Sequence, residues 1–409
     1  MKKRILALAM AAVMAGSLTA CSGSSGTDTK AAPAETEAPA SESKSEAKEE
    51  SKAGEGDAAN TSSSKGGAEG YELALVTDLG TIDDKSFNQG AWEGLKKYAE
   101  ENSIAYKYYQ PQEGTTDSYL ETIGLAIEGG AKLVVCPGFL FEEPIYLAQD
   151  KYPDVHFILL DGEPHDADYN YKTNDNVMPI LFQEDQAGFL AGYAVVKDGY
   201  TKLGFMGGMA VPAVIRFGYG FVQGAEFAAE EDGVTGVEVM YNYTGGFAAT
   251  PEAQSMAASW YQNGTEVIFG CGGAVGNSVM AAAQEKNAKV IGVDVDQSAN
   301  IDTYGEGMCV TSAMKGLAET VEHMLGEVVA GNFANYGGQV ETLGLVNGDD
   351  PTANYVQLPM ETTQWGDGFT QDDYKALVKA MYDGDVTVSN DISAMPATTI
   401  TVNFAGNIK

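Results

Sequence analysis

Polar and aromatic residues follow the first apolar run of the folded part of the chain. The run 71–77 leads into Asp78, and Phe87 and Asn88 come soon after it. The carboxylate and the amide offer hydrogen-bond acceptors and donors, and the aromatic ring offers an apolar plane for stacking. The position of Phe87 at a helix start, at the mouth of the predicted sheet, indicates stacking on a planar ligand. The acidic and hydroxyl residues at 83–86 also suit a helix cap, and core packing is the alternative role of Phe87.

Sequence patterns that indicate catalysis or metal binding are missing from the chain. The glycine-rich segment at 270–273 is not followed by the Lys-Ser/Thr of a phosphate-binding loop, and no nucleophile elbow occurs. His156, His165 and His323 have no metal-ligand spacing. We therefore predict no catalytic residue, no metal and no cofactor.

The chain is strongly acidic, with 58 Asp and Glu against 24 Lys and Arg and a formal net charge of −34. Such a charge repels nucleic acids, so we expect no nucleic-acid partner. After Cys21 the cysteines are Cys136, Cys271 and Cys309, an odd number that argues against a disulfide framework. Cys136 and Cys271 lie in apolar runs typical of buried strands.

Strand-like apolar runs alternate with segments of helical periodicity. The alternation predicts parallel strands joined by crossover helices, hence an α/β fold with both faces of each sheet covered. The predicted strands are 71–77, 104–109, 133–136, 155–160, 203–206, 237–241, 267–269 and 290–293, and the predicted helices are 88–102, 118–128, 142–151, 185–192, 214–231, 251–262 and 276–286. The folded part of the chain, from about 71 to 409, has roughly 340 residues. This exceeds the usual size of a single hydrophobic core and favours two Rossmann-like lobes. The ligand is expected in a cleft beyond the carboxyl ends of the strands.

The N-terminus has the pattern of a lipoprotein export signal. A basic start at 2–4 and an apolar run over 5–18 precede Thr19-Ala20-Cys21. We predict a signal peptide over 1–20, too short to span a bilayer comfortably, and a lipidated Cys21 that anchors the protein to the extracytoplasmic face of the cell membrane. An ordinary cleaved signal with an incidental cysteine is the alternative. Residues 22–70 contain no aromatic or large aliphatic residue, so 21–70 is predicted to be the lipidated cysteine and a disordered tether.

Several short motifs occur through the chain in a fixed order. The first is VTDLGTIDDKSFNQGAWEG at 76–94, and the others are CPGF at 136–139, GFLAG at 188–192, GGM at 207–209, Arg216-Phe217, IGVDVDQ at 291–297, and Thr311-Ser312 with Lys315. This ordered set resembles the basic membrane protein family of purine-nucleoside-binding lipoproteins. Ala210-Val211, where the family pattern suggests an acidic residue, and the loosely matching segment from 339 onward depart from that family.

The resemblance implies a type I periplasmic-binding-protein fold with two lobes, a ligand cleft and a hinge of three chain crossings. It implies lobe 1 over 71–183, lobe 2 over 184–307, a return to lobe 1 over 308–340, and completion of lobe 2 with a C-terminal tail over 341–409. The implied ligand-binding residues are the stacking rings Phe87 and Phe217, Asp78 and Asn88 at the mouth of the first strand, Asp161 for the edge of the base, Asp294 and Lys315 for the ribose hydroxyls, and the neighbouring Gly272.

The implied function is capture of a purine nucleoside (inosine, guanosine or adenosine) for an ABC importer. Its partners would be the permease and ATPase subunits, and the binding protein itself is expected to be a monomer. Three alternatives stay open: the same fold binding a sugar or a flavin, a surface sensor, and a nucleoside-hydrolysing enzyme that uses aspartates near the ribose.

Overall fold

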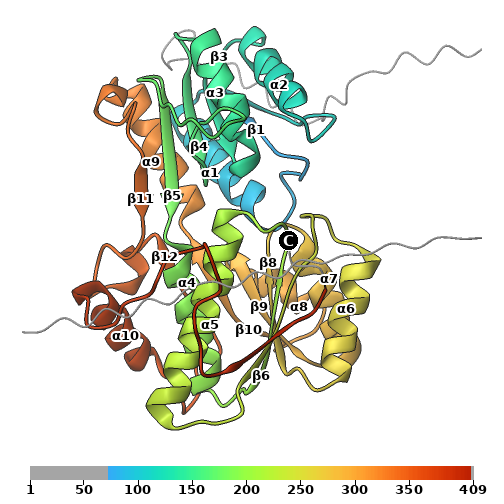
Figure 1. Ribbon diagram of the computed structural model, residues 1–409. Coiled ribbons are helices and arrows are strands. Elements are labelled where there is room, and N and C mark those ends of the chain that lie inside the picture. The colour runs from blue at the N-terminus through green and yellow to red at the C-terminus, as the bar shows by residue number, and fades with distance from the viewer. Residues whose placement is uncertain (1–71, 407–409) are drawn as a thin grey trace, which may run out of the picture. The chain divides into compact units, whose positions relative to one another are not determined.

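The computed structural model describes residues 72–406, which form two sheets with helices on both faces of each (Figure 1). The predicted signal peptide, Cys21 and the tether lie outside the described residues. No helix within 72–406 is both long enough and apolar enough to cross a bilayer.

The first sheet has six parallel strands in the order β11-β5-β4-β3-β1-β2. They are β1 (Glu72–Val76), β2 (Ala105–Tyr109), β3 (Ala131–Pro137), β4 (His156–Leu160), β5 (Val177–Phe182) and β11 (Glu341–Leu343). The helices of this lobe are α1 (Phe87–Asn102), α2 (Thr116–Glu128), α3 (Glu142–Lys151) and α9 (Leu317–Val329), with short 3₁₀ turns at Phe139–Phe141 and Phe333–Asn335.

Alternation along β1 explains why helices cover both faces of the first sheet. Leu73 and Leu75 are buried against α1 and α9, whereas Ala74 and Val76 are buried against α2 and α3. Side chains of a strand point to opposite faces in turn, so a strand that is apolar throughout needs cover on both sides.

The second sheet has seven strands in the order β12-β10-β9-β8-β6-β7-β13, and only the β12 pairing is antiparallel. They are β6 (Lys202–Gly207), β7 (Glu238–Tyr243), β8 (Val267–Cys271), β9 (Lys289–Asp294), β10 (Cys309–Lys315), β12 (Val356–Gln357) and β13 (Thr401–Phe404). One face packs on α4 (Glu184–Lys197), α5 (Pro212–Asp232) and α10 (Gln371–Asp383), and the other on α6 (Pro251–Gln262), α7 (Val275–Lys286) and α8 (Ser298–Asp302). A 3₁₀ turn spans Pro351–Ala353.

The chain crosses between the lobes three times, after β5, after β10 and after β11. The crossings lie together, because the amide of Gln183 donates to the carbonyl of Leu343 (2.8 Å) and the amide of Gly316 donates to that of Tyr355 (2.7 Å). Two lobes joined by three adjacent crossings confirm the predicted fold class.

Two of the predicted boundaries are wrong. β10 was assigned to the return segment 308–340 of lobe 1, but it pairs with β9, and Val310 and Ala313 are buried in the core of lobe 2. β11 was assigned to the completion of lobe 2, but it pairs with β5, and Leu343 is buried in the core of lobe 1. The return segment therefore begins at α9 and ends with β11.

The tail after β12 packs on lobe 2. Tyr374 and Val378 of α10 are buried in the core of that lobe, and β13 extends its sheet beside β7. The tail thus completes both a core and a sheet edge.

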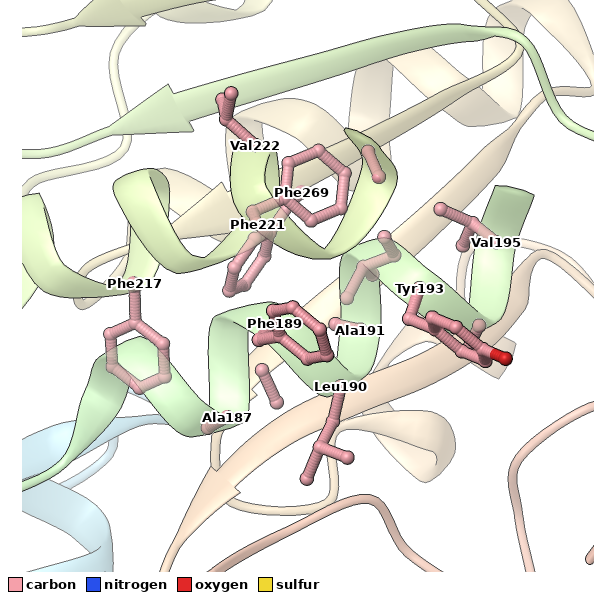
Figure 2. Close-up of a cluster of buried hydrophobic side chains, with 14 of the residues drawn as sticks. Ala187, Phe189, Leu190, Ala191, Tyr193, Val195, Phe217, Phe221, Val222 and Phe269 are labelled. Atoms are coloured by element: carbon pink, nitrogen blue, oxygen red, sulfur yellow. The ribbon is translucent and has the colours of Figure 1, made fainter. Parts of the chain in front are cut away.

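Helices α4 and α5 pack at close range. A Cβ atom at Gly188 would lie 2.1 Å from the carbonyl oxygen of Phe217, and one at Gly220 would lie 2.1 Å from that of Asp185. Only glycine therefore fits at these contacts. Figure 2 shows the side chains around this helix pair, with Phe217 on α5 and Phe189 on α4.

Candidate functional site

A cavity of about 570 Å³ lies at the carboxyl ends of strands from both sheets. This volume is within the usual range of small-molecule sites. All eight residues that were predicted as ligand contacts line it, namely Asp78, Phe87, Asn88, Asp161, Phe217, Gly272, Asp294 and Lys315. The structure thus brings residues from distant parts of the chain to one cavity, and their contacts with a ligand stay a prediction.

The start of α1 is capped by Asp84 rather than by Ser86. The carboxylate of Asp84 accepts the backbone amides of Ser86 (2.9 Å), Asn88 (3.0 Å) and Gln89 (3.1 Å). Ser86 occupies the N-cap position without a capping bond, and its hydroxyl donates to Asp294 of the other lobe. Capping by a neighbouring polar residue was expected, and it leaves Ser86 free for a contact between the lobes.

Asn88 is held by two carboxylates, and this fixes its amide group. Its Nδ2 donates to Asp78 Oδ1 (2.9 Å) and to Asp84 Oδ2 (3.1 Å). Its Oδ1 is buried and has no hydrogen-bond partner. Burial raises the pKa of Asp78, although bonds from Gly80 and Asn88 act in the opposite direction. A ligand in the cavity would find an unused acceptor on Asn88, and an unpaired buried acceptor favours a ligand that carries a donor.

Corresponding strands of the two lobes end in matching residues at the cavity. β4 leads into Asp161 (φ 58°) and β9 ends in Asp294 (φ 66°), both in the left-handed region. β3 and β8 are followed by Gly138 (φ 116°) and Gly272 (φ 119°). Aspartate tolerates left-handed backbone better than most side chains do, and glycine adopts it without strain. At these matching positions each lobe presents a glycine turn and a carboxylate to the cavity, and lobe 1 adds Asp78 and Asp84.

Buried charges join the lobes at the cavity. The ammonium of Lys315 contacts Asp161 of lobe 1, and it lies 3.3 Å from Glu184 Oε1 and 3.7 Å from Asp294 Oδ1. Glu184 also pairs with Arg216, whose Nε lies 2.5 Å from Glu184 Oε2. The sequence prediction paired Lys315 with Asp294, whereas Asp161 and Glu184 are its closer partners.

Burial and ion pairing compete in this cluster. Burial raises the pKa of Asp161 to about 7, although the positive charge of Lys315 opposes the shift. Burial also raises the pKa of Asp294. Burial acts to raise the pKa of Glu184 too, but Arg216 and Lys315 outweigh it and lower that pKa. Burial would lower the pKa of Lys315, but the surrounding carboxylates raise it. Asp161 Oδ1 is buried without a partner, so it provides a second unused acceptor.

Aromatic rings surround the same ammonium group. Lys315 Nζ lies 4.5 Å from the ring centroid of Phe87 and 5.4 Å from that of Phe217. Phe139 and Phe247 also line the cavity, which makes its walls largely apolar. Flat apolar walls with a few fixed polar atoms suit a planar ligand with a polar edge.

Several residues of the cavity wall and of the adjoining ion-pair cluster were missed as site residues. Phe139, Gly138 and Arg216 stand in motifs that the sequence already offered, whereas Glu184 and Phe247 carry no local signal. Glu184 is the first residue of α4 and is fully buried, a position that only the packing of the two lobes reveals.

Cys271 lines the cavity as an unpaired thiol, and burial raises its pKa well above the ordinary value. Cys136 and Cys309 are also buried and unpaired. Within residues 72–406 no group of three His, Cys, Asp or Glu side chains is placed to hold a metal ion. The groups that line the cavity can make hydrogen bonds, ion pairs and stacking contacts.

Residues 71–349 match the family described as ABC transporter substrate-binding protein PnrA-like. The ABC transporter nucleoside-binding protein BmpA of Lactococcus lactis subsp. cremoris is 30% identical over 295 residues, which cover 68% of this chain and 80% of that protein. Basic membrane protein B of Borreliella burgdorferi is 29% identical over 283 residues, which cover 68% of this chain and 79% of that protein.

Solved structures of solute-binding proteins share the fold. An ABC transporter system solute-binding protein from Aeropyrum pernix K1 superposes with a TM-score of 0.61 at 24% identity, covering 78% of this chain and 87% of that one. Another from Conexibacter woesei has a TM-score of 0.59 at 23% identity, covering 78% and 99%. At these identities the likeness concerns the fold alone.

Proposed function

The chain belongs to the family of PnrA-like ABC transporter substrate-binding proteins, and we propose that its ligand is a purine nucleoside. It is a substrate-binding protein and not an enzyme, as the family match and the relative from Lactococcus lactis show. The observation that carries the proposal is the cavity itself, where aromatic rings, unused acceptors and a buried Asp–Lys cluster converge between two lobes.

A purine nucleoside matches these features group by group. The base stacks against Phe87 and Phe217, and each aromatic stack contributes roughly 1–3 kcal/mol by analogy with nucleic-acid stacking. N–H groups on the edge of the base donate to the unused oxygens of Asn88 and Asp161. The vicinal diol of the ribose donates to the Asp294 carboxylate, a charge-assisted arrangement that Lys315 supports.

The relative from Lactococcus lactis, named for nucleoside binding, supports the same ligand class. In the proposed cycle the protein is a monomer held at the extracytoplasmic face by lipid on Cys21. It delivers its ligand to an ABC permease driven by ATPase subunits, because substrate-binding proteins of ABC transporters serve that kind of importer.

A thermal-shift screen of the chain carrying Cys21→Ser tests the ligand class. Inosine, guanosine, adenosine, ribose, a hexose and riboflavin are the probes. A ligand that binds only the folded state at 100 times its Kd adds about 2.7 kcal/mol of stability. We expect a higher Tm with at least one purine nucleoside and no change with ribose alone. A shift with the hexose or riboflavin and none with nucleosides would keep the fold and refute the ligand.

A further inference from the structure

Three polar residues of the sequence motifs make contacts between the lobes without lining the cavity. Lys85 and Ser86 belong to the first motif, and Gln297 ends the IGVDVDQ motif. Ligand contact therefore does not account for them, yet all three take part in bonds between the lobes.

Gln297 is fixed within lobe 2 and reaches lobe 1 with the end of its side chain. Its side-chain Oε1 accepts a hydrogen bond from the backbone amide of Val293 (3.0 Å). Its backbone amide donates to Ser312 Oγ (3.1 Å). Its Nε2 donates to the carbonyl oxygen of Lys85 across the cleft (2.6 Å). Gln297 is 2% exposed whereas Lys85 lies at the surface, so the bond between them is part-buried. A hydrogen bond of this kind forms only when the lobes are together.

The carbonyl of Lys85 is presented by an unusual backbone. Lys85 has a φ of 61°, in the left-handed region, and its amide donates to Gln89 Oε1 (3.1 Å). A non-glycine residue in this region costs conformational free energy, which the surrounding contacts must offset. The conformation turns the carbonyl of Lys85 toward Gln297.

The neighbouring residue makes the second bond between the lobes. The Ser86 hydroxyl donates to Asp294 Oδ2, while Asp294 Oδ1 faces Lys315 and Asp294 itself lines the cavity. One carboxylate thus takes part both in the wall of the cavity and in the contact that holds the lobes together.

We propose that Lys85, Ser86, Asp294 and Gln297 form an interlobe latch that sets how long a ligand stays bound. Gln297 is its positioning residue: it touches no ligand and acts by holding lobe 1 against lobe 2 through the carbonyl of Lys85. The inference rests on the proposed function only in its choice of inosine as the probe ligand.

Gln297→Glu tests the latch. Glutamate keeps an acceptor for the amide of Val293, but it replaces the donor to Lys85 with a second acceptor. Loss of one hydrogen bond between the lobes plus repulsion between the acceptors should raise the inosine dissociation rate by about 10-fold. The association rate should not fall, because the unliganded variant, with its latch broken, leaves the cavity open for longer. Stopped-flow fluorescence gives both rates.

Closure of the lobes is measured separately, by energy transfer between two dyes in a chain carrying Cys21→Ser. The dyes are attached at the exposed positions Glu121→Cys in lobe 1 and Glu252→Cys in lobe 2. Without ligand, Gln297→Glu should lower the transfer efficiency. The control is Gln284→Glu, which removes a side-chain bond to the carbonyl of Tyr304 within lobe 2. It should change neither the rates nor the transfer.

The outcomes separate the two proposals. If inosine fails to bind the wild type, the ligand is wrong, and a lower transfer efficiency for Gln297→Glu still supports the latch. If inosine binds and Gln297→Glu leaves both the dissociation rate and the transfer efficiency at wild-type values, the latch is refuted. Should Gln297→Glu not fold, Ser86→Ala replaces it with the same expected changes, and unchanged rates and transfer in that variant refute the latch.

Discussion

Phe87 and Phe217 line the same cavity but lie in different surroundings. Phe87 is half-buried at the first residue of α1, whereas Phe217 is 2% exposed and packs edge-on against Phe269, with ring centroids 5.9 Å apart. A wall ring contributes mainly to stacking on a ligand. A ring that also belongs to the core contributes to folding.

Truncation should separate these two roles. Phe87→Ala is expected to weaken inosine binding by about 10- to 100-fold, with little loss of folding stability. Phe217→Ala should weaken binding and also lower the free energy of unfolding by about 3–5 kcal/mol. Titration calorimetry and urea denaturation without ligand measure the two effects. Equal stability losses in both variants would contradict this assignment.

The pH dependence of binding should come from Asp161. Burial raises the pKa of Asp161 to about 7, and in the proposed complex the ionised carboxylate accepts an N–H of the base. Ligand binding favours the ionised form and lowers this pKa in the complex. The affinity for inosine is therefore complete above pH 7 and falls by up to about 10-fold per pH unit below it.

Calorimetry between about pH 5.5 and pH 8.5 covers this titration. In Asp161→Asn the residue at 161 cannot titrate, so the dependence should flatten while affinity at high pH falls. A slope that survives in Asp161→Asn would assign the titration to another carboxylate.

Single residues of the site were predictable where a motif contained them. Asp161 and Asp294 stand at the ends of apolar runs, and the rule for open α/β sheets places such residues at the ligand. The partner of Lys315 was not predictable in this way. Asp161 comes from the other lobe, and no spacing along the chain encodes a distance across a cleft.

At the scale of elements, the pair α4 and α5 orients several site residues. α4 begins with Glu184, and α5 carries Arg216 and Phe217. Because Gly188 and Gly220 let the two backbones touch, they also fix the distance between Glu184 and Arg216.

Gly220→Ala should therefore damage both fold and site. The added methyl group would meet the carbonyl of Asp185, and we expect a loss of about 2–4 kcal/mol in the free energy of unfolding together with weaker inosine binding. The control is Gly326→Ala in α9, where the nearest atom to an added Cβ lies at 3.7 Å. That variant should be neutral or slightly more stable, since alanine favours helix. Denaturant titration of both variants compares them, and similar losses would contradict close helix contact as the cause.

Some elements with regular periodicity were predicted well, the amphipathic helices α9 and α10 were not predicted, and some strands were missed for physical reasons. α1 was predicted over 88–102 and spans Phe87–Asn102. β5 was missed because Pro179 interrupts its apolar run, and proline is rare inside sheets. β10 was missed because its sequence CVTSAMK mixes polar and apolar residues on buried positions. Such a strand forms because the fold buries both of its faces, and no local sequence pattern predicts that burial.

At the scale of the whole molecule, the order in which the chain visits the two lobes explains why the predicted lobe boundaries were wrong. β10 ends the first passage of the chain through lobe 2, and the helix after it, α9, already packs on lobe 1. The chain therefore changes lobes at Gly316 within one residue. No run of Pro, Gly or charge marks this point, because the crossing is buried in the hinge.

The charge of the protein should exclude phosphorylated ligands. The cavity and its border hold Asp78, Asp84, Asp161, Glu184 and Asp294 against Lys315 and Arg216, and the whole chain carries −34. Inosine 5′-monophosphate should bind at least about 100-fold more weakly than inosine, because its phosphate adds charge of the same sign. Competition against bound inosine measures the ratio. Equal affinities would place the 5′ position of the ribose in open solvent.

The matching turns at the ends of β3, β4, β8 and β9 have a consequence for release. Each lobe supplies a glycine turn and a carboxylate at these positions, so neither lobe alone carries the complete lining of the cavity. The ligand is in effect bivalent, with the hinge as the linker that gives the second lobe a high effective concentration at the first. Avidity of this kind disappears once the lobes separate. An importer that pulls them apart can therefore take a tightly held ligand without breaking every contact at once.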